Sequence, residues 1–139
     1  MMVTRIEENL VAAVSFLNAR GMHVPIVDGL PNVGWAVIDC NTLNQCGSVV
    51  LFPSVDGEDV EMIADGGWTA PSARNIFDAV FCRFDHPRLT ARCPVASTKN
   101  IRILQRMGFR IEGIKRCSSG NVVMLGMLKS ECRLLKRMH

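Results

Sequence analysis

Six cysteines and three histidines supply the side chains of this sequence that most readily bind metal ions or act as nucleophiles. No two cysteines form a C-x-x-C pair, and no histidine stands at ligand spacing from a cysteine. Because a structural zinc site needs such closely spaced ligands, the sequence predicts no metal site. Most of the cysteines lie in apolar runs, which is typical of small core residues in a reducing, cytosolic protein. The cysteines are Cys40, Cys46, Cys82, Cys93, Cys117 and Cys132, and the histidines, which we expect in loops or at the surface, are His23, His86 and His139.

The positive charge of the sequence is concentrated in its last third. Residues 1–98 contain six Lys/Arg and eleven Asp/Glu, whereas residues 99–139 contain ten Lys/Arg and two Asp/Glu. The net charge therefore changes from −5 to +8 between the two parts of a chain whose total is +3. A basic segment of this kind is suited to the phosphates of a cofactor or of a nucleic acid, or simply faces water. Because Phe109 is its one aromatic residue, stacking on nucleic-acid bases is disfavoured.

The segment from Ser97 to Arg116 has the most informative spacing of residue types. Its first half places apolar residues at three- and four-residue intervals on one face of a predicted helix and polar residues on the other face. Gly108 stands where a helix commonly ends in a left-handed residue, and a strand is expected to begin at Phe109. The apolar positions are Ile101, Leu104 and Met107, and the polar ones are Asn100, Arg102, Gln105 and Arg106.

This pattern of helix, Gly-Phe, strand, Glu-Gly and Arg resembles the acyl-CoA-binding half of the GNAT superfamily of N-acetyltransferases. Within the superfamily it looks most like the branch that acetylates the N-termini of ribosomal proteins. It also looks like small acetyltransferase-like proteins of tailed bacteriophages. The resemblance covers residues 97–116 at the level of residues and 34–129 at the level of element order. The matching positions are Arg102, Gly108, Phe109, Glu112, Gly113 and Arg116, and Asn100 stands where the branch has serine.

The resemblance implies that acetyl-CoA binds between two strands. In this fold the fourth strand, here residues 59–64, splays from its neighbour, and the pantetheine arm fills the gap as a pseudo-strand. The pyrophosphate is then expected at a loop that enters a helix N-terminus, where backbone amides favour an anion. Asn100 is implied as a hydrogen-bond partner of the pantetheine, with an ordinary polar residue at a helix start as the alternative. The cofactor-binding residues so implied are Met62, Ile63, Ala64, Gly66, Gly67, Trp68, Thr69, Ala70, Arg74 and Asn100.

The expected phosphate loop departs from the family's pattern, Gln/Arg-x-x-Gly-x-Gly/Ala. Gly66 and Gly67 still permit a close approach of the backbone to a ligand, and Arg74 is placed to add a charge-assisted contact. Pro71, however, removes one amide donor, and Trp68 is bulky. A simple turn with a tryptophan at its rim is therefore the alternative interpretation of this loop.

Transfer of an acetyl group needs a base for the amine and an acid for the leaving thiolate. Glu61 lies on the expected fourth strand, where the resemblance implies a carboxylate that accepts the amine proton, often through water. The alternative is an ordinary exposed strand carboxylate. The family's usual acid is a tyrosine at the position of Leu104, and this chain contains no tyrosine. Ser97, Thr98, Cys117 or water would then have to serve as the proton donor.

The element order predicts one α+β domain over residues 1–139, in three layers, with the mixed and mostly antiparallel sheet of the GNAT fold flanked by helices. Thr4 and Glu7 have capping-box spacing, so the first helix is expected to begin at Thr4 and end at Gly21. The family's usual first strand is not evident. Further helices are predicted at 72–84 and 97–108. Strands are predicted at 34–40, 48–55, 59–64, 89–94, 109–116 and 122–129, with breaks at 56–58 and 65–67. A loop or irregular edge strand is predicted at 23–31, and a basic tail, helical or frayed, at 130–139.

The leading hypothesis is an N-acetyltransferase-like protein that transfers an acetyl group from acetyl-CoA to a primary amine, either a protein N-terminus or a small molecule. A catalytically inactive protein of the same fold, working as a structural or interaction protein of phage origin, is the alternative, and a nucleic-acid-binding module is the third hypothesis. No apolar run reaches the roughly 20 residues of a membrane span, and the acidic start MMVTRIEENL is unlike a signal peptide. We therefore expect a cytoplasmic protein with no membrane partner, and homodimer formation remains open.

Overall fold

The computed structural model describes residues 2–24, 32–53, 59–118 and 120–136. The predicted turn at 56–58 and most of the loop predicted at 23–31 lie outside these residues. The strands are β1 (Thr4–Glu8), β2 (Val33–Asp39), β3 (Gln45–Pro53), β4 (Val60–Gly66), β5 (Arg88–Pro94), β6 (Arg110–Lys115) and β7 (Val122–Leu128). The helices are α1 (Leu10–Ala19), α2 (Ala70–Asp78), α3 (Thr98–Met107) and α4 (Arg133–Lys136), with a π-helical turn at Ala79–Arg83 and a 3₁₀ turn at Lys129–Glu131.

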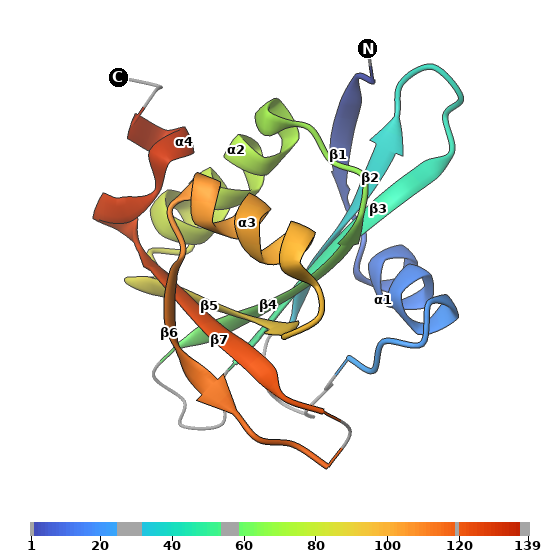
Figure 1. Ribbon diagram of the computed structural model, residues 1–139. Coiled ribbons are helices and arrows are strands. Elements are labelled where there is room, and N and C mark those ends of the chain that lie inside the picture. The colour runs from blue at the N-terminus through green and yellow to red at the C-terminus, as the bar shows by residue number, and fades with distance from the viewer. Residues whose placement is uncertain (1, 25–31, 54–58, 119, 137–139) are drawn as a thin grey trace.

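Within the described chain, seven strands form one sheet in the order β1-β2-β3-β4-β5-β7-β6. Five neighbouring pairs are antiparallel, and β4 with β5 is parallel. A parallel pair needs a crossover connection, which α2 and the π-helical turn provide. The predicted fold class, a mixed and mostly antiparallel sheet flanked by helices, is confirmed (Figure 1).

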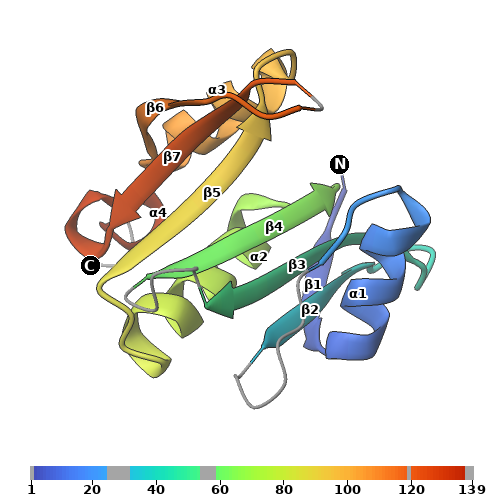
Figure 2. The same cartoon turned by 90° about the horizontal axis from the view of Figure 1, so that it is seen from below.

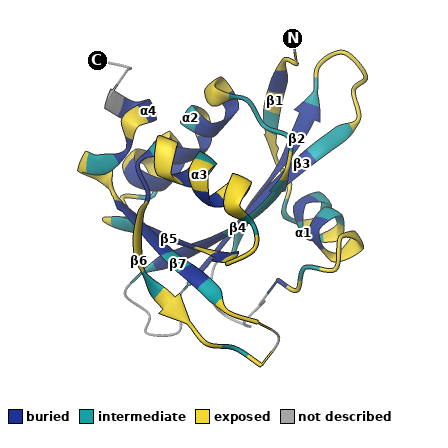
Figure 3. Ribbon diagram, in the orientation of Figure 1, coloured by how far each residue is buried: buried dark blue, intermediate teal, exposed yellow. Residues whose placement is uncertain are grey.

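Helices cover the two faces of the sheet in different amounts. Helix α1 packs on β2 and β3 from one face, over a small core of Ala13, Leu17, Val24 and Val50. Helices α2, α3 and α4 lie on the other face, where the larger core contains the fully buried Phe77. The strands are buried at their centres, whereas the outer surface of α3 is exposed (Figure 3). Two cores on opposite faces of one sheet give the three layers expected from the sequence.

The first residues of the chain form a strand, so the predicted helix start at Thr4 is wrong. Strand β1 pairs with β2, and Ile6 packs against the larger core. The Thr4 hydroxyl bonds to that of Ser72 at 2.6 Å instead of capping a helix. The real N-cap of α1 is Asn9, whose side chain accepts a hydrogen bond from the Ala12 amide at 3.0 Å. Pairing with β2 and the packing of Ile6 against the core outweigh the local capping pattern. The sequence analysis found no first strand, and β1 takes that place.

Strand β4 is longer than predicted. Asp65 and Gly66 were expected to break the strand, but they belong to it and pair with Ser48 and Gly47 of β3. Gly66 has a φ of 90°, and a Cβ there would collide with the carbonyl oxygen of Cys46. Glycine therefore lets the end of β4 stay against β3, so the strand ends two residues later than expected.

Gly108 ends α3 as predicted and brings two distant segments together. Its φ is 123°, and an added Cβ would meet the carbonyl oxygen of Glu131 in the turn before α4. The absence of a side chain at Gly108 therefore permits close packing of the C-terminal segment on the end of α3. The segment predicted as a tail is packed here, and Cys132, Leu134 and Leu135 are buried.

We expect Gly108→Ala to destabilise the protein more than Gly120→Ala. Gly120 is a matched control because its φ is 125° and nothing lies within 4 Å of a Cβ built on it. The control should lose about 1–3 kcal/mol of unfolding free energy from backbone strain alone. Gly108→Ala should lose at least about 2 kcal/mol more because the methyl group overpacks the contact with Glu131. Urea denaturation of both variants measures the difference, and equal losses would contradict this account of the contact.

Candidate functional site

Strands β4 and β5 separate halfway along β4. Their ladder joins Val60 to Leu89, Glu61 to Thr90 and Met62 to Ala91, and it ends there. Beyond this point β4 continues only on β3, and β5 continues on β7, so the two strands diverge (Figure 2). The backbone groups that face the gap therefore have no ladder partner in the opposite strand. The strands separate at the place expected from the sequence.

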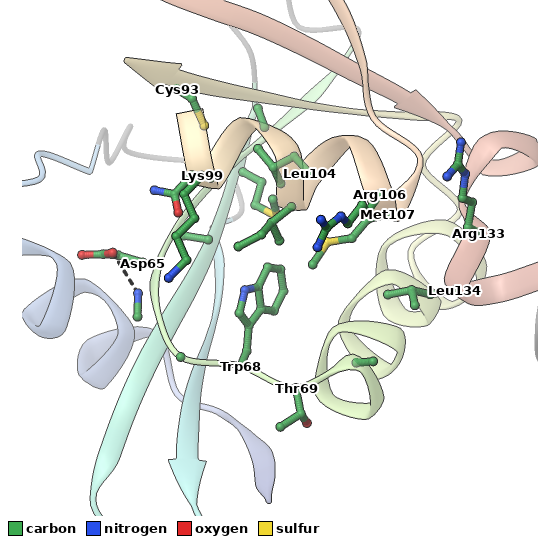
Figure 4. A pocket seen from close by; sticks show the side chains of 18 of the residues that line it. Asp65, Trp68, Thr69, Cys93, Lys99, Leu104, Arg106, Met107, Arg133 and Leu134 are labelled. Carbon is green, nitrogen blue, oxygen red and sulfur yellow. Dashed lines mark hydrogen bonds between the residues drawn. The ribbon is translucent and has the colours of Figure 1, made fainter. Parts of the chain in front are cut away.

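A cavity of about 610 Å³ lies in the opening between the diverging strands. Its walls come from β4, the loop into α2, β5, α3 and the start of α4 (Figure 4). This volume lies in the range of small-molecule sites, roughly 300–1,000 Å³. Eight of the ten residues predicted to bind a cofactor line the cavity: Met62, Ala64, Gly66, Gly67, Trp68, Thr69, Ala70 and Asn100.

The other two predicted cofactor-binding residues do not line the cavity. Ile63 points to the opposite face of the sheet, as strand alternation requires, and packs against the core beneath α1. Arg74 lies in the second turn of α2, and its Nε is buried without a hydrogen-bond partner. The sequence placed both residues near the correct segment but could not show which way their side chains point.

Glu61 lies behind the cavity wall. The residue is only 6% exposed, so the alternative prediction of an exposed strand carboxylate is wrong. It is covered because Phe52 of β3 and Thr90 of β5 flank it in the sheet. Its Oε1 accepts a hydrogen bond from Nη2 of Arg92 at 2.8 Å, and Arg92 itself lines the cavity. An ion pair thus lies where the two strands part.

The loop from Gly67 to Ala70 leads from β4 into the N-terminus of α2. The Gly67 amide donates to the carbonyl oxygen of Cys46 at 2.9 Å, and the Thr69 amide donates to the Thr4 hydroxyl at 3.3 Å. Thr69 is the N-cap residue, but its side chain makes no capping hydrogen bond. The first turn of α2 therefore presents its positive dipole end next to Thr69 and Ala70, which line the cavity.

Trp68 stands on this loop with its ring directed toward α3 (Figure 4). The ring packs edge-on against Phe77, with the ring centroids 6.0 Å apart. Trp68 forms part of the cavity wall. A volume of about 610 Å³ remains open beside its side chain. The alternative interpretation from the sequence was a simple turn with a tryptophan at its rim, and the structure places Trp68 in the wall of the cavity.

The cavity lining carries an excess of positive charge. Arg92, Lys99, Arg106 and Arg133 line it, and Asp65 is the acidic residue among the lining residues. Sequence analysis did not identify Lys99, Arg106 or Arg133 as site residues. The basic composition of residues 99–139 was the available signal, but it could not show that α3 and α4 turn these cations toward one cavity.

The side of the cavity next to the strand opening is apolar and contains one thiol. Cys93 of β5 lines it and is 8% exposed, and burial raises the pKa of its thiol. Leu104 also lines it and is buried at the position where the resemblance has tyrosine. Ser97, Thr98 and Cys117, the proton donors considered from the sequence, are not among the lining residues.

No three His, Cys, Asp or Glu side chains in the described part of the chain gather into a group that could hold a metal ion. None of its helices combines the length and the apolar character needed to cross a membrane.

No protein-family model and no curated protein matches the sequence. Among solved structures, a mutant of the spermidine N-acetyltransferase SpeG from Vibrio cholerae is similar, with a TM-score of 0.75 at 14% identity over 98% of both chains. Another pair of mutant forms, of the spermidine/spermine N-acetyltransferase SpeG from the same organism, has a TM-score of 0.73 at 15% identity, covering 99% of this chain and 100% of that one.

An acetyltransferase of the GNAT family from Bacillus anthracis is similar over a smaller part. Its TM-score is 0.61 at 19% identity, and the match covers 70% of this chain and 67% of that chain. These identities are low, so the comparison concerns the arrangement of the backbone. The structural neighbours are GNAT acetyltransferases, and the chain has the GNAT fold.

Proposed function

We propose that this protein transfers an acetyl group from acetyl-CoA to a primary amine. The observation that carries the proposal is the end of the β4–β5 ladder at Met62 and Ala91, which leaves strand edges unpaired beside a cavity of about 610 Å³. A pantetheine arm has two amides, which match such edges as a third strand would. The fold shared with SpeG, named as a spermidine N-acetyltransferase, supports the same reaction class.

The basic side of the cavity supports a donor that carries phosphates. The amides of Gly67 and Thr69 are already bonded within the protein, so those of Trp68 and Ala70 would face a diphosphate at the N-terminus of α2. Lys99 and Arg106 of α3 add charge on the other wall of the cavity. Neither Lys99 nor Arg106 forms an ion pair with a described residue. Their charges are therefore available to an anionic ligand.

In the reaction, the amine nitrogen attacks the thioester carbon after losing a proton, and the CoA thiolate leaves and gains one. Glu61 is the proposed proton acceptor, through water, because it lies one residue before the end of the β4–β5 ladder and the bond to Arg92 occupies only its Oε1. Asp65 is the second candidate, since it lines the cavity directly. Cys93 is the proposed proton donor, because its thiol lines the cavity on the side next to the strand opening, and burial raises the pKa of this thiol.

An inactive donor-binding protein is the second candidate function. The Glu61–Arg92 ion pair favours it, because the pair must rearrange or act through water before Glu61 accepts a proton. The absence of tyrosine also favours it. The likeness to the ribosomal-protein branch, the phage origin, the cytoplasmic location and a homodimer stay predictions from the sequence.

Binding of the donor is tested by titration with acetyl-CoA. We expect saturable binding with a Kd between about 1 μM and 1 mM, and a change in the fluorescence of Trp68, which lines the cavity, whereas Trp35 is only 2% exposed. Ala64→Phe should weaken binding at least about tenfold by filling the cavity. Val11→Phe, at a position on α1 that is 77% exposed, should leave the affinity unchanged. No heat and no fluorescence change at millimolar acetyl-CoA would exclude the proposed donor.

The role of Glu61 is tested with Glu61→Gln in an assay that detects free CoA with a panel of primary amines, spermidine included. Glutamine keeps an oxygen that accepts from Arg92, so the variant should fold. If Glu61 is the base, kcat should fall by about 10²–10⁴ while the affinity for acetyl-CoA stays the same. Asp65→Asn, at the second candidate for the base, is measured beside it. An unchanged kcat in Glu61→Gln with a loss in Asp65→Asn would move the role to Asp65.

A further inference from the structure

A second hollow adjoins the main cavity between α3 and α4. Its volume is about 370 Å³, and it is lined by Arg102, Gln105 and Arg106 of α3 and by Arg133 of α4. Arg106 and Arg133 line both hollows, so the two lie next to each other. In Figure 4, Arg106 and Arg133 lie at the side of the main cavity away from Cys93 and Asp65. We call this hollow the arginine groove.

The three guanidinium groups of the arginine groove have no carboxylate partner among the described residues. Six other arginines each form an ion pair: Arg5, Arg20, Arg83, Arg88, Arg92 and Arg110. Glu131, the acidic residue nearest in sequence to Arg133, is occupied by Arg110 at 2.7 Å and by the Leu128 amide. The charges of the groove are therefore not neutralised by this part of the protein.

The helix that presents these charges gains no stability from them. Lys99, Arg102 and Arg106 follow one another at three- and four-residue spacing, so they share one face of α3. Like charges at this spacing repel, and Lys99 also opposes the positive end of the helix dipole. No acidic residue lies in the first turn of α3 to offset this repulsion. A bound anion would relieve it.

We propose that the arginine groove binds the phosphate monoester on the ribose of acetyl-CoA, so that the protein selects CoA over its dephosphorylated form. This inference rests on the proposed function. A phosphate monoester carries close to two negative charges at neutral pH, and arginine forks bind such groups with two parallel hydrogen bonds each. The diphosphate is matched to the amides at the α2 end of the cavity, so the groove serves a separate phosphate.

The composition of the groove argues against two other ligands. It contains no aromatic side chain, so it offers no surface on which an adenine or a nucleic-acid base would stack. The groove is also a small cluster of four residues. It is not a long basic track along which a strand of phosphodiesters would lie. A single, highly charged phosphate group fits it better.

The test compares the affinities of CoA and 3′-dephospho-CoA for the whole protein and three variants by calorimetry. The wild type should bind CoA about tenfold or more tightly than dephospho-CoA. Arg102→Gln and Arg133→Gln should each lower the affinity for CoA about tenfold. Arg102 lines the groove but not the main cavity. Arg102→Gln should leave dephospho-CoA unchanged. Arg116→Gln is the matched control, because Arg116 is exposed, forms no ion pair with a residue that the structure describes, and lies outside both hollows.

The outcomes separate this inference from the proposed function. Equal wild-type affinity for both ligands overturns the arginine groove but leaves the donor site in place. The groove is also overturned if Arg102→Gln and Arg116→Gln both lower the affinity for CoA and for dephospho-CoA by the same factor. Such a result would reflect the net charge of the protein and not a phosphate site. Binding of neither ligand overturns both proposals. Tight binding of a single-stranded oligonucleotide that Arg102→Gln abolishes, with the CoA preference unchanged, assigns the groove to nucleic acid instead.

Discussion

The short parallel ladder between β4 and β5 is the constraint on which the site depends. It joins three residue pairs, whereas β3 with β4 and β5 with β7 each join seven. Each half of the sheet is therefore held by its own long antiparallel ladder, and the twist of the strands turns the halves away from each other. Ala64 and Ala91 keep the angle open because they add little volume. The gap is thus a property of the sheet and needs no ligand to hold it open.

The segment around α3 was predictable because its signals are local. Helical spacing, Gly108 and the strand that follows are set by neighbouring residues, and the structure has all three. β1 was not predictable, because Thr4 and Glu7 fit a capping box while the decisive partners, β2 and Ser72, are distant in sequence. The loop from Gly67 to Ala70 lines the cavity at the place that element order indicated, and its binding of a cofactor stays a prediction. The charges from α3 and α4, and the burial of Glu61, depend on tertiary packing and gave no clear sequence signal.

Charges are arranged differently on the two faces of the opened sheet. On the face away from the cavity, Glu61 pairs with Arg92, and Arg88 pairs with Asp59 and Glu112, so the carboxylates there are neutralised within the protein. On the cavity face, the cations of α3 and α4 lack such partners in the described chain. Arg92 takes part in both arrangements: it donates a hydrogen bond to Glu61, and it also lines the cavity. The protein therefore separates internal ion pairing from the charge that it offers to a ligand.

The strand order has a consequence for how the site forms during synthesis. β7 lies between β5 and β6, so β5 keeps an unpaired edge until β7, which begins 28 residues after β5 ends, inserts beside it. The cavity also takes walls from residue 62 to residue 134. A nascent chain that has emerged only as far as α3 would therefore expose an open strand edge and half a pocket, which makes that stage the one most prone to mispairing on the ribosome.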